Sequence, residues 1–195
     1  MKDPIKTLLM PVVVSALLLS GCAQPTSELR TTSDSLIDIP PTIADLARKS
    51  ELIVTGTVTS AGEVWNIARG QDPTTPSTAY IDMAQNFVLT VDGTLKGTAG
   101  REVTWAVTKG SGAHASLPVT FDANWTPPTI GARYLLFLVK IPGTEIYGIP
   151  AEPSRFRLEA DNAQSESRYS AATQKYPAMT AASLLAQVRA AVARP

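Results

Sequence analysis

The feature that most constrains the fold is an alternation of apolar and polar residues that recurs along the middle of the chain. In residues 52–65, LIVTGTVTSAGEVW, apolar side chains at alternate positions share one face, while Ile53 and three threonines occupy the other. The same period of two appears in residues 81–91 and in residues 103–107. This period, rich in β-branched residues, is typical of strands that bury one face. These segments therefore predict a mainly β domain.

Further segments add strands and turns. Residues 134–139, YLLFLV, are apolar on both faces, which predicts a central strand or one that is covered by a helix. Residues 145–149 and 155–160 predict two short strands, and residues 161–167, DNAQSES, predict a loop. Gly56 lies inside the first strand, where a glycine predicts a bulge or a sharp bend.

Two helices are predicted at the ends of this set of strands. Thr42 precedes apolar residues at helical spacing, and Asp45 completes a weak capping box. Residues 179–193 predict a helix with Thr180 as its N-cap and an apolar stripe of four residues, Leu184, Leu185, Val188 and Val192. The predicted fold is α+β and mainly β: a small curled antiparallel sheet, or an OB-like barrel, of five to six strands between these helices.

From residue 42 to about residue 160, the order of elements resembles that of small OB-type barrels, the tissue-inhibitor- and netrin-like modules of exported proteins. The resemblance rests on ELIVTGTV, a long strand ending in LKG, EVTWAV and YLLFL. It implies a barrel with a binding role. Those inhibitors chelate a protease's zinc through an N-terminal cysteine. The only cysteine of this chain lies in a different motif, so inhibition of a metalloprotease is not expected.

The N-terminus has the layout of a secretory signal. Positive residues begin the chain, residues 8–19 are almost wholly apolar, and small residues follow. The apolar run is shorter than the roughly 17 residues that span a bilayer. We expect residues 1–21 to be a signal peptide, residues 22–40, rich in Ser, Thr, Asp and Pro, to be a flexible tether, and residues 41–195 to form a single globular domain.

Four residues at the end of this signal, Leu19, Ser20, Gly21 and Cys22, resemble the lipobox of bacterial lipoproteins. The resemblance implies cleavage before Cys22, a diacylglyceryl group on its sulfur and an added acyl chain, such as palmitate, on the new amino terminus. A thiolate is nucleophilic enough to take the lipid, and two or three acyl chains make a stable anchor. The expected location is the cell membrane or the outer membrane, with the domain outside the cytoplasm. Ala23, in place of an aspartate, favours the outer membrane.

Composition excludes several classes of partner. The chain has 17 basic and 17 acidic residues without a basic block, so a nucleic-acid partner is not expected. Its single cysteine permits no disulfide within the domain. One histidine and one cysteine cannot build a typical zinc site. No cofactor or metal is expected.

No catalytic residue can be named from a motif. Ser111 and His114 lie in a glycine-rich stretch, residues 110–115. The helix that a dinucleotide site requires does not follow it, and the sequence contains no G-x-S-x-G elbow of a hydrolase. Three acidic residues in and just before the predicted loop 161–167, Glu159, Asp161 and Glu166, lack the spacing of a calcium loop.

Trp125 is the candidate for contact with a ligand. It lies in the proline-containing loop DANWTPPTIGA, residues 122–132, where no alternation predicts burial. Tryptophan is favoured at recognition sites because it brings a large contact area at little cost in entropy. The alternative is that Trp125 plugs the open end of a barrel.

Two functions remain open. The first is a membrane-anchored lipoprotein of the bacterial cell envelope, whose domain is a non-catalytic binding or structural module for a protein or a glycan. The alternative is an extracytoplasmic enzyme with a carboxylate-based site, because paired acids need no sequence motif. Acidic side chains that converge in a deep pocket would favour the enzyme, and a shallow groove beside Trp125 would favour the binding module.

Overall fold

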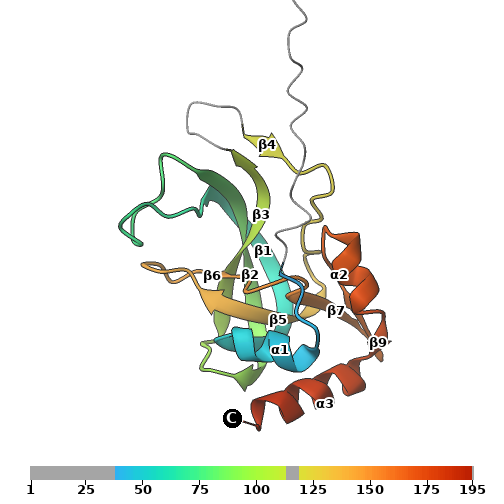
Figure 1. Ribbon diagram of the computed structural model, residues 1–195. Helices are drawn as coiled ribbons and strands as arrows, with labels where there is room; N and C mark the ends of the chain where they lie inside the picture. The colour runs from blue at the N-terminus through green and yellow to red at the C-terminus, as the bar shows by residue number, and fades with distance from the viewer. Residues whose placement is uncertain (1–37, 113–118, 195) are drawn as a thin grey trace, which may run out of the picture. The chain divides into compact units, whose positions relative to one another are not determined.

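The computed structural model describes residues 38–112 and 119–194, and this part of the chain is mainly β (Figure 1). The helices are α1 (Ile43–Lys49), α2 (Ser170–Lys175) and α3 (Ala181–Val192). The strands are β1 (Leu52–Asn66), β2 (Ile81–Lys96), β3 (Glu102–Gly112), β4 (Thr120–Phe121), β5 (Arg133–Lys140), β6 (Tyr147–Gly148), β7 (Arg155–Glu159), β8 (Asn162–Ser165) and β9 (Met179–Thr180). Within these ranges, no helix combines the length and the apolar character needed to cross a bilayer.

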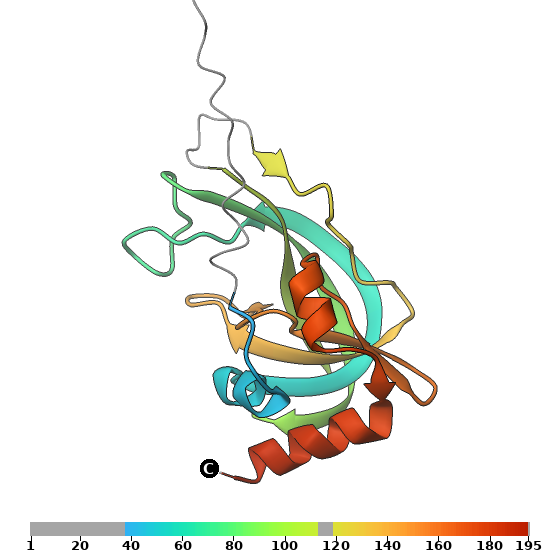
Figure 2. The same cartoon turned by 45° about the vertical axis from the view of Figure 1, so that its right-hand side comes forward.

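Five of the strands close into a ring. β1 pairs with both β2 and β5, β2 also pairs with β3, and β5 also pairs with β6. The ring closes through a parallel bridge between Trp105 of β3 and Tyr147 of β6, and the other pairings in the described sheet are antiparallel. Figure 2 shows β1 curving along the wall of this barrel. The predicted class, α+β and mainly β with an OB-like barrel, is confirmed.

β1 pairs with both β2 and β5, and its register shifts at Gly56. The register of β1 against β2 shifts between Thr55 and Gly56, so the bulge predicted at this glycine is confirmed. A Cβ atom added to Gly56 would lie 2.2 Å from the carbonyl oxygen of Thr90. Only glycine allows the two backbones to approach this closely.

β5 separates two hydrophobic cores, which explains why it is apolar on both faces. Leu136 and its alternate neighbours point into the barrel, where they meet Trp105. Leu135 and Phe137 point outward into a second core under α1 and α3. The strand is therefore both central in the sheet and covered by helices. The barrel core consists of Leu52, Val54, Val58, Phe87, Leu89, Val103, Trp105, Tyr134, Leu136 and Leu138.

The sheet continues beyond the ring from β5 through β7 and β8 to β9. The prediction of a loop at residues 161–167 is wrong for β8, where Ala163 and Ser165 are buried and Asn162 and Gln164 are exposed. The alternation is present but is made of small residues, which carry little hydrophobic signal. The short helix α2 was not predicted either.

Both predicted helix caps are confirmed. The Thr42 hydroxyl accepts a hydrogen bond from the Asp45 amide at 3.1 Å, and the Thr180 hydroxyl accepts one from the Ser183 amide at 3.1 Å. The stripe of α3 is narrower than predicted. Leu184 and Val188 are fully buried, whereas Leu185 and Val192 lie at its edge and are only partly buried.

Candidate functional site

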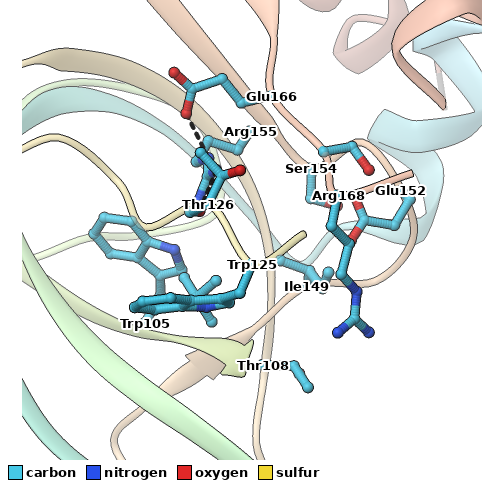
Figure 3. A pocket seen from close by; sticks show the side chains of 12 residues that line it. Trp105, Thr108, Trp125, Thr126, Ile149, Glu152, Ser154, Arg155, Glu166 and Arg168 are labelled. Carbon is cyan, nitrogen blue, oxygen red and sulfur yellow. Dashed lines mark hydrogen bonds and ion pairs between the residues drawn. The ribbon is translucent and has the colours of Figure 1, made fainter. Parts of the chain in front are cut away.

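A pocket opens where β3 meets the connections from β6 to β7 and from β8 to α2 (Figure 3). Its volume is about 60 Å³. Two tryptophans, two glutamates and two arginines give it its chemical character. The full lining comprises Trp105, Val107, Thr108, Trp125, Thr126, Ile149, Glu152, Ser154, Arg155, Glu166, Ser167 and Arg168.

Trp105 forms a rigid inner wall of this pocket. The alternation of β3 turns its side chain into the barrel, where 1% of the residue is exposed. Its indole packs against Phe87 with ring centroids 5.6 Å apart. The same core that holds the barrel together therefore fixes one face of the pocket.

Trp125 also lines the pocket, from the loop between β4 and β5. Its side chain is partly buried and packs against the barrel core, and the Lys109 ammonium lies 4.3 Å from its ring centroid. Its Nε1 atom is buried and has no hydrogen-bond partner among the described residues. Trp125 thus packs against the barrel core and lines a pocket, and its contact with a ligand stays a prediction.

Arg155 ties this loop to the extension of the sheet. Its side chain is 9% exposed, and its Nη2 donates to the Thr126 carbonyl oxygen at 3.0 Å. Its Nε lies 2.9 Å from Glu166 Oε2, but neither atom has a hydrogen bond of acceptable geometry within the described chain. The pair therefore neutralises charge without satisfying either atom (Figure 3).

Arg168 and Glu152 supply the remaining charges. The Arg168 guanidinium lies 3.2 Å from an Asp122 carboxylate oxygen, which pairs a second positive charge. Burial raises the pKa of Glu152 above its usual value, and a hydrogen bond from Ser167 and the charges of Arg168 and Arg155 oppose this shift only in part. The pocket therefore combines internally paired charges with one carboxyl group that resists ionisation.

Several residues singled out in the sequence lie elsewhere. Leu19, Ser20, Gly21, Cys22 and His114 fall outside the described residues. Ser111 belongs to β3 and pairs with Asp82 of β2.

The three acidic residues considered as calcium ligands, Glu159, Asp161 and Glu166, do not form a metal site. Glu159 pairs with Arg157, whereas Glu166 contacts Arg155 in the pocket. Over residues 38–112 and 119–194, no three His, Cys, Asp or Glu side chains are grouped so that they could hold a metal ion.

Sequence reasoning missed three of the charged residues of the pocket, Glu152, Arg155 and Arg168, and considered Glu166 only as a calcium ligand. The four belong to no motif and come from two separate stretches of the chain. One weak signal exists, because Arg155 begins a short strand whose next residue, Phe156, is apolar. That pattern does not say whether the arginine is buried.

No protein-family model matches the chain, and a search of curated proteins finds no similar sequence. Function therefore has to be inferred from the pocket and from the N-terminal motif.

Proposed function

We propose that the chain is a membrane-anchored lipoprotein of the bacterial cell envelope, and that its domain is a non-catalytic binding module. The lipobox-like residues 19–22 support the anchor. The pocket between Trp105 and Trp125 supports the binding role, with a protein or a glycan as the ligand class.

One observation carries the binding role: the partly buried indole of Trp125 lines, together with the buried Trp105, a small pocket whose charges are mostly paired. Indole walls hold a ligand through contact area. Paired charges orient polar groups without adding a large net field. Such a lining suits recognition better than proton transfer, which needs a group free to gain and lose a proton.

The anchor is tested by Cys22→Ser in the full precursor. Serine keeps the size of the side chain but removes the thiolate that accepts the lipid. We expect wild-type protein to incorporate a clickable fatty acid and to partition into detergent. The Cys22→Ser form should do neither, and it should keep its signal peptide and run larger on a gel.

Ser27→Ala, in the predicted tether, is the matched control and should label like wild type. A wild-type protein that carries no lipid and is released in mature form would refute the anchor and the membrane location.

The pocket is tested by Trp125→Ala in the mature protein. The residue lies in a loop, so its loss should leave the barrel folded while removing one wall of the pocket. We expect retention on isolated envelope fractions to fall about thirtyfold, because an aromatic anchor contributes about 2 kcal/mol or more at a recognition site and each 1.4 kcal/mol is about a factor of ten. Trp65→Ala, outside the pocket, is the control. Equal retention of both variants and wild type would contradict a binding role for this pocket.

A second candidate, a carboxylate-based enzyme, is favoured by one observation. Glu152 and Glu166 line the same pocket, and burial raises the pKa of Glu152. Enzymes use carboxyl groups with raised pKa values as general acids. Turnover of envelope glycans or peptides that disappears in Glu152→Gln would favour this candidate over the binding module.

A further inference from the structure

The helices α1 and α3 pack against each other and share a groove that opens to solvent. Its volume is about 440 Å³. The apolar part of its lining is Ile43, Ala44, Ala190 and Ala191. Arg48 of α1 and Arg194, just after α3, bring two guanidinium groups to the same groove, and both side chains are exposed.

Every exposed charged residue on these two helices and on the residues that follow α3 up to position 194 is basic. The set is Arg48, Lys49, Arg189 and Arg194. Two acidic residues oppose it, because the partly exposed Asp45 contacts Arg48 and Asp38 lies 2.8 Å from Lys49. Arg189 and Arg194 form no ion pair with any described residue. Four basic and two acidic groups leave an excess of two positive charges on this surface.

The proposed anchor determines which surface these charges meet. The lipid is attached at Cys22, and residues 23–37 connect it to Asp38, which lies shortly before α1 in the chain. A segment of this length reaches about 50 Å when fully extended, and as a flexible coil it spans about 20 Å. The domain therefore meets the lipid surface at an effective concentration in the millimolar range. A weak attraction is then enough to hold one face of the domain against it.

The charge of this surface is complementary to anionic phospholipid. A basic side chain near an anionic lipid surface strengthens binding about fivefold. Arginine suits a phosphate group because its planar guanidinium donates two parallel hydrogen bonds. The alanine side chains between the arginines are short, so they leave room for a headgroup to approach. An acidic protein segment would match the same charges, but the anchor brings lipid to this surface whatever protein is near.

We propose that the exposed surface of α1 and α3 docks onto anionic phospholipid, with phosphate headgroups at Arg48 and Arg194. This inference rests on the proposed lipid anchor and adds an orientation to it. Figures 1 and 2 both show α1 and α3 at one end of the fold and β4 at the other. The docked domain therefore presents the end that carries β4 away from the membrane.

The test measures how residues 22–195 with Cys22→Ser, expressed without the signal peptide, partition onto lipid vesicles in a sedimentation assay. This chain carries no lipid, so only the surface of the domain can hold it. One set of vesicles is an equimolar mixture of phosphatidylglycerol and phosphatidylcholine, and the other is phosphatidylcholine alone. At low ionic strength we expect partitioning onto the anionic vesicles to be at least about tenfold stronger. Added salt should remove the difference, because it screens exposed charges.

Two double variants separate this surface from the net charge of the domain. Arg48→Gln with Arg194→Gln removes both guanidinium groups of the groove and should lower partitioning onto anionic vesicles about tenfold or more. Lys140→Gln with Lys175→Gln, on β5 and α2, removes the same charge elsewhere and should lower it far less. Ala190→Glu places a negative charge in the groove and should also abolish the preference for anionic vesicles. All five side chains are exposed, so the melting temperatures should match that of wild type.

Each other outcome overturns the inference. Equal partitioning onto both kinds of vesicle would show that the surface does not recognise anionic lipid. Equal losses in the two double variants would assign the attraction to net charge and not to this surface. A chain that ignores vesicles but dimerises, or binds an acidic peptide, through Arg48 and Arg194 would have a protein as its partner. If Cys22 takes up a fatty acid and the unlipidated chain does not partition, the docking is wrong and the anchor stands; if neither occurs, both are wrong.

Discussion

At the scale of single residues, Glu152 sets a pH dependence for the fold. Burial raises its pKa above the usual value of 4.5. The folded protein therefore holds this proton more tightly than the unfolded chain does. The stabilisation from the protonated group is complete below about pH 4.5 and is lost as the pH rises through the raised pKa.

Glu152→Gln should remove this loss, because glutamine keeps the shape of the side chain without ionising. We expect the variant to melt at a higher temperature than wild type at pH 7, with a difference that shrinks as the pH falls towards 4.5. Thermal melts over this pH range measure the effect. Glu145→Gln is the control, since that side chain is 93% exposed. A Glu152→Gln protein less stable than wild type at neutral pH would contradict the prediction.

Only some residues of the pocket could be predicted from the sequence. Trp125 could be found, because a tryptophan in a loop without alternation is conspicuous. Its partners could not be found. Arg155 and Glu166 meet because β7 and β8 form a hairpin, in which the Glu166 amide donates to the Arg155 carbonyl oxygen at 2.9 Å. A segment predicted as a loop has no register, and without register no side chain can be paired with another.

At the scale of elements, α3 shows which part of an apolar stripe carries stability. The sequence predicts a stripe of four residues, but α3 packs against α1 and the second core with only Leu184 and Val188 fully buried. Leu185 is turned towards the edge. Periodicity identifies the face of a helix, whereas the packing angle decides which residues on that face are fully covered.

Leu184→Ala should therefore lower the free energy of unfolding by about 2–5 kcal/mol, the usual cost of a cavity at a fully buried leucine. Leu185→Ala should cost distinctly less, and Gln187→Ala, on the exposed face, should cost little. Urea denaturation of the three variants gives this ranking. Equal losses would show that α3 is not packed against the second core as described.

At the scale of the whole molecule, the long strands were predictable, whereas the sequence left open the choice between a curled sheet and a closed barrel. β1, β2, β3 and β5 carry strong alternation or a continuous apolar run. β6 is two residues long, and its single bridge to β3 joins Tyr147 to Trp105. A strand of two residues is too short to show an alternation of apolar and polar residues in the sequence. Its pairing nevertheless decides whether the sheet is open or closed.

A closed barrel with a second core should unfold as one unit. We expect residues 22–195 with Cys22→Ser, expressed without the signal peptide, to give a mainly β circular-dichroism spectrum and a single cooperative melt. Chelator and reductant should leave the melting temperature unchanged, since the predicted domain after position 22 has no cysteine. A melt that shifts with chelator would reveal a bound metal.

The double pairing of β1 has a consequence for how the chain folds. Leu52, near the start of the described residues, pairs with Leu138, so β1 cannot pair with β5 until most of the chain has been made. Contacts this distant along the chain slow folding, into the range of milliseconds to seconds for barrels of this kind. During vectorial synthesis, the first half of β1 therefore has one unpaired edge that can recruit other strands. Truncated products that end before β5 should aggregate where the complete chain folds.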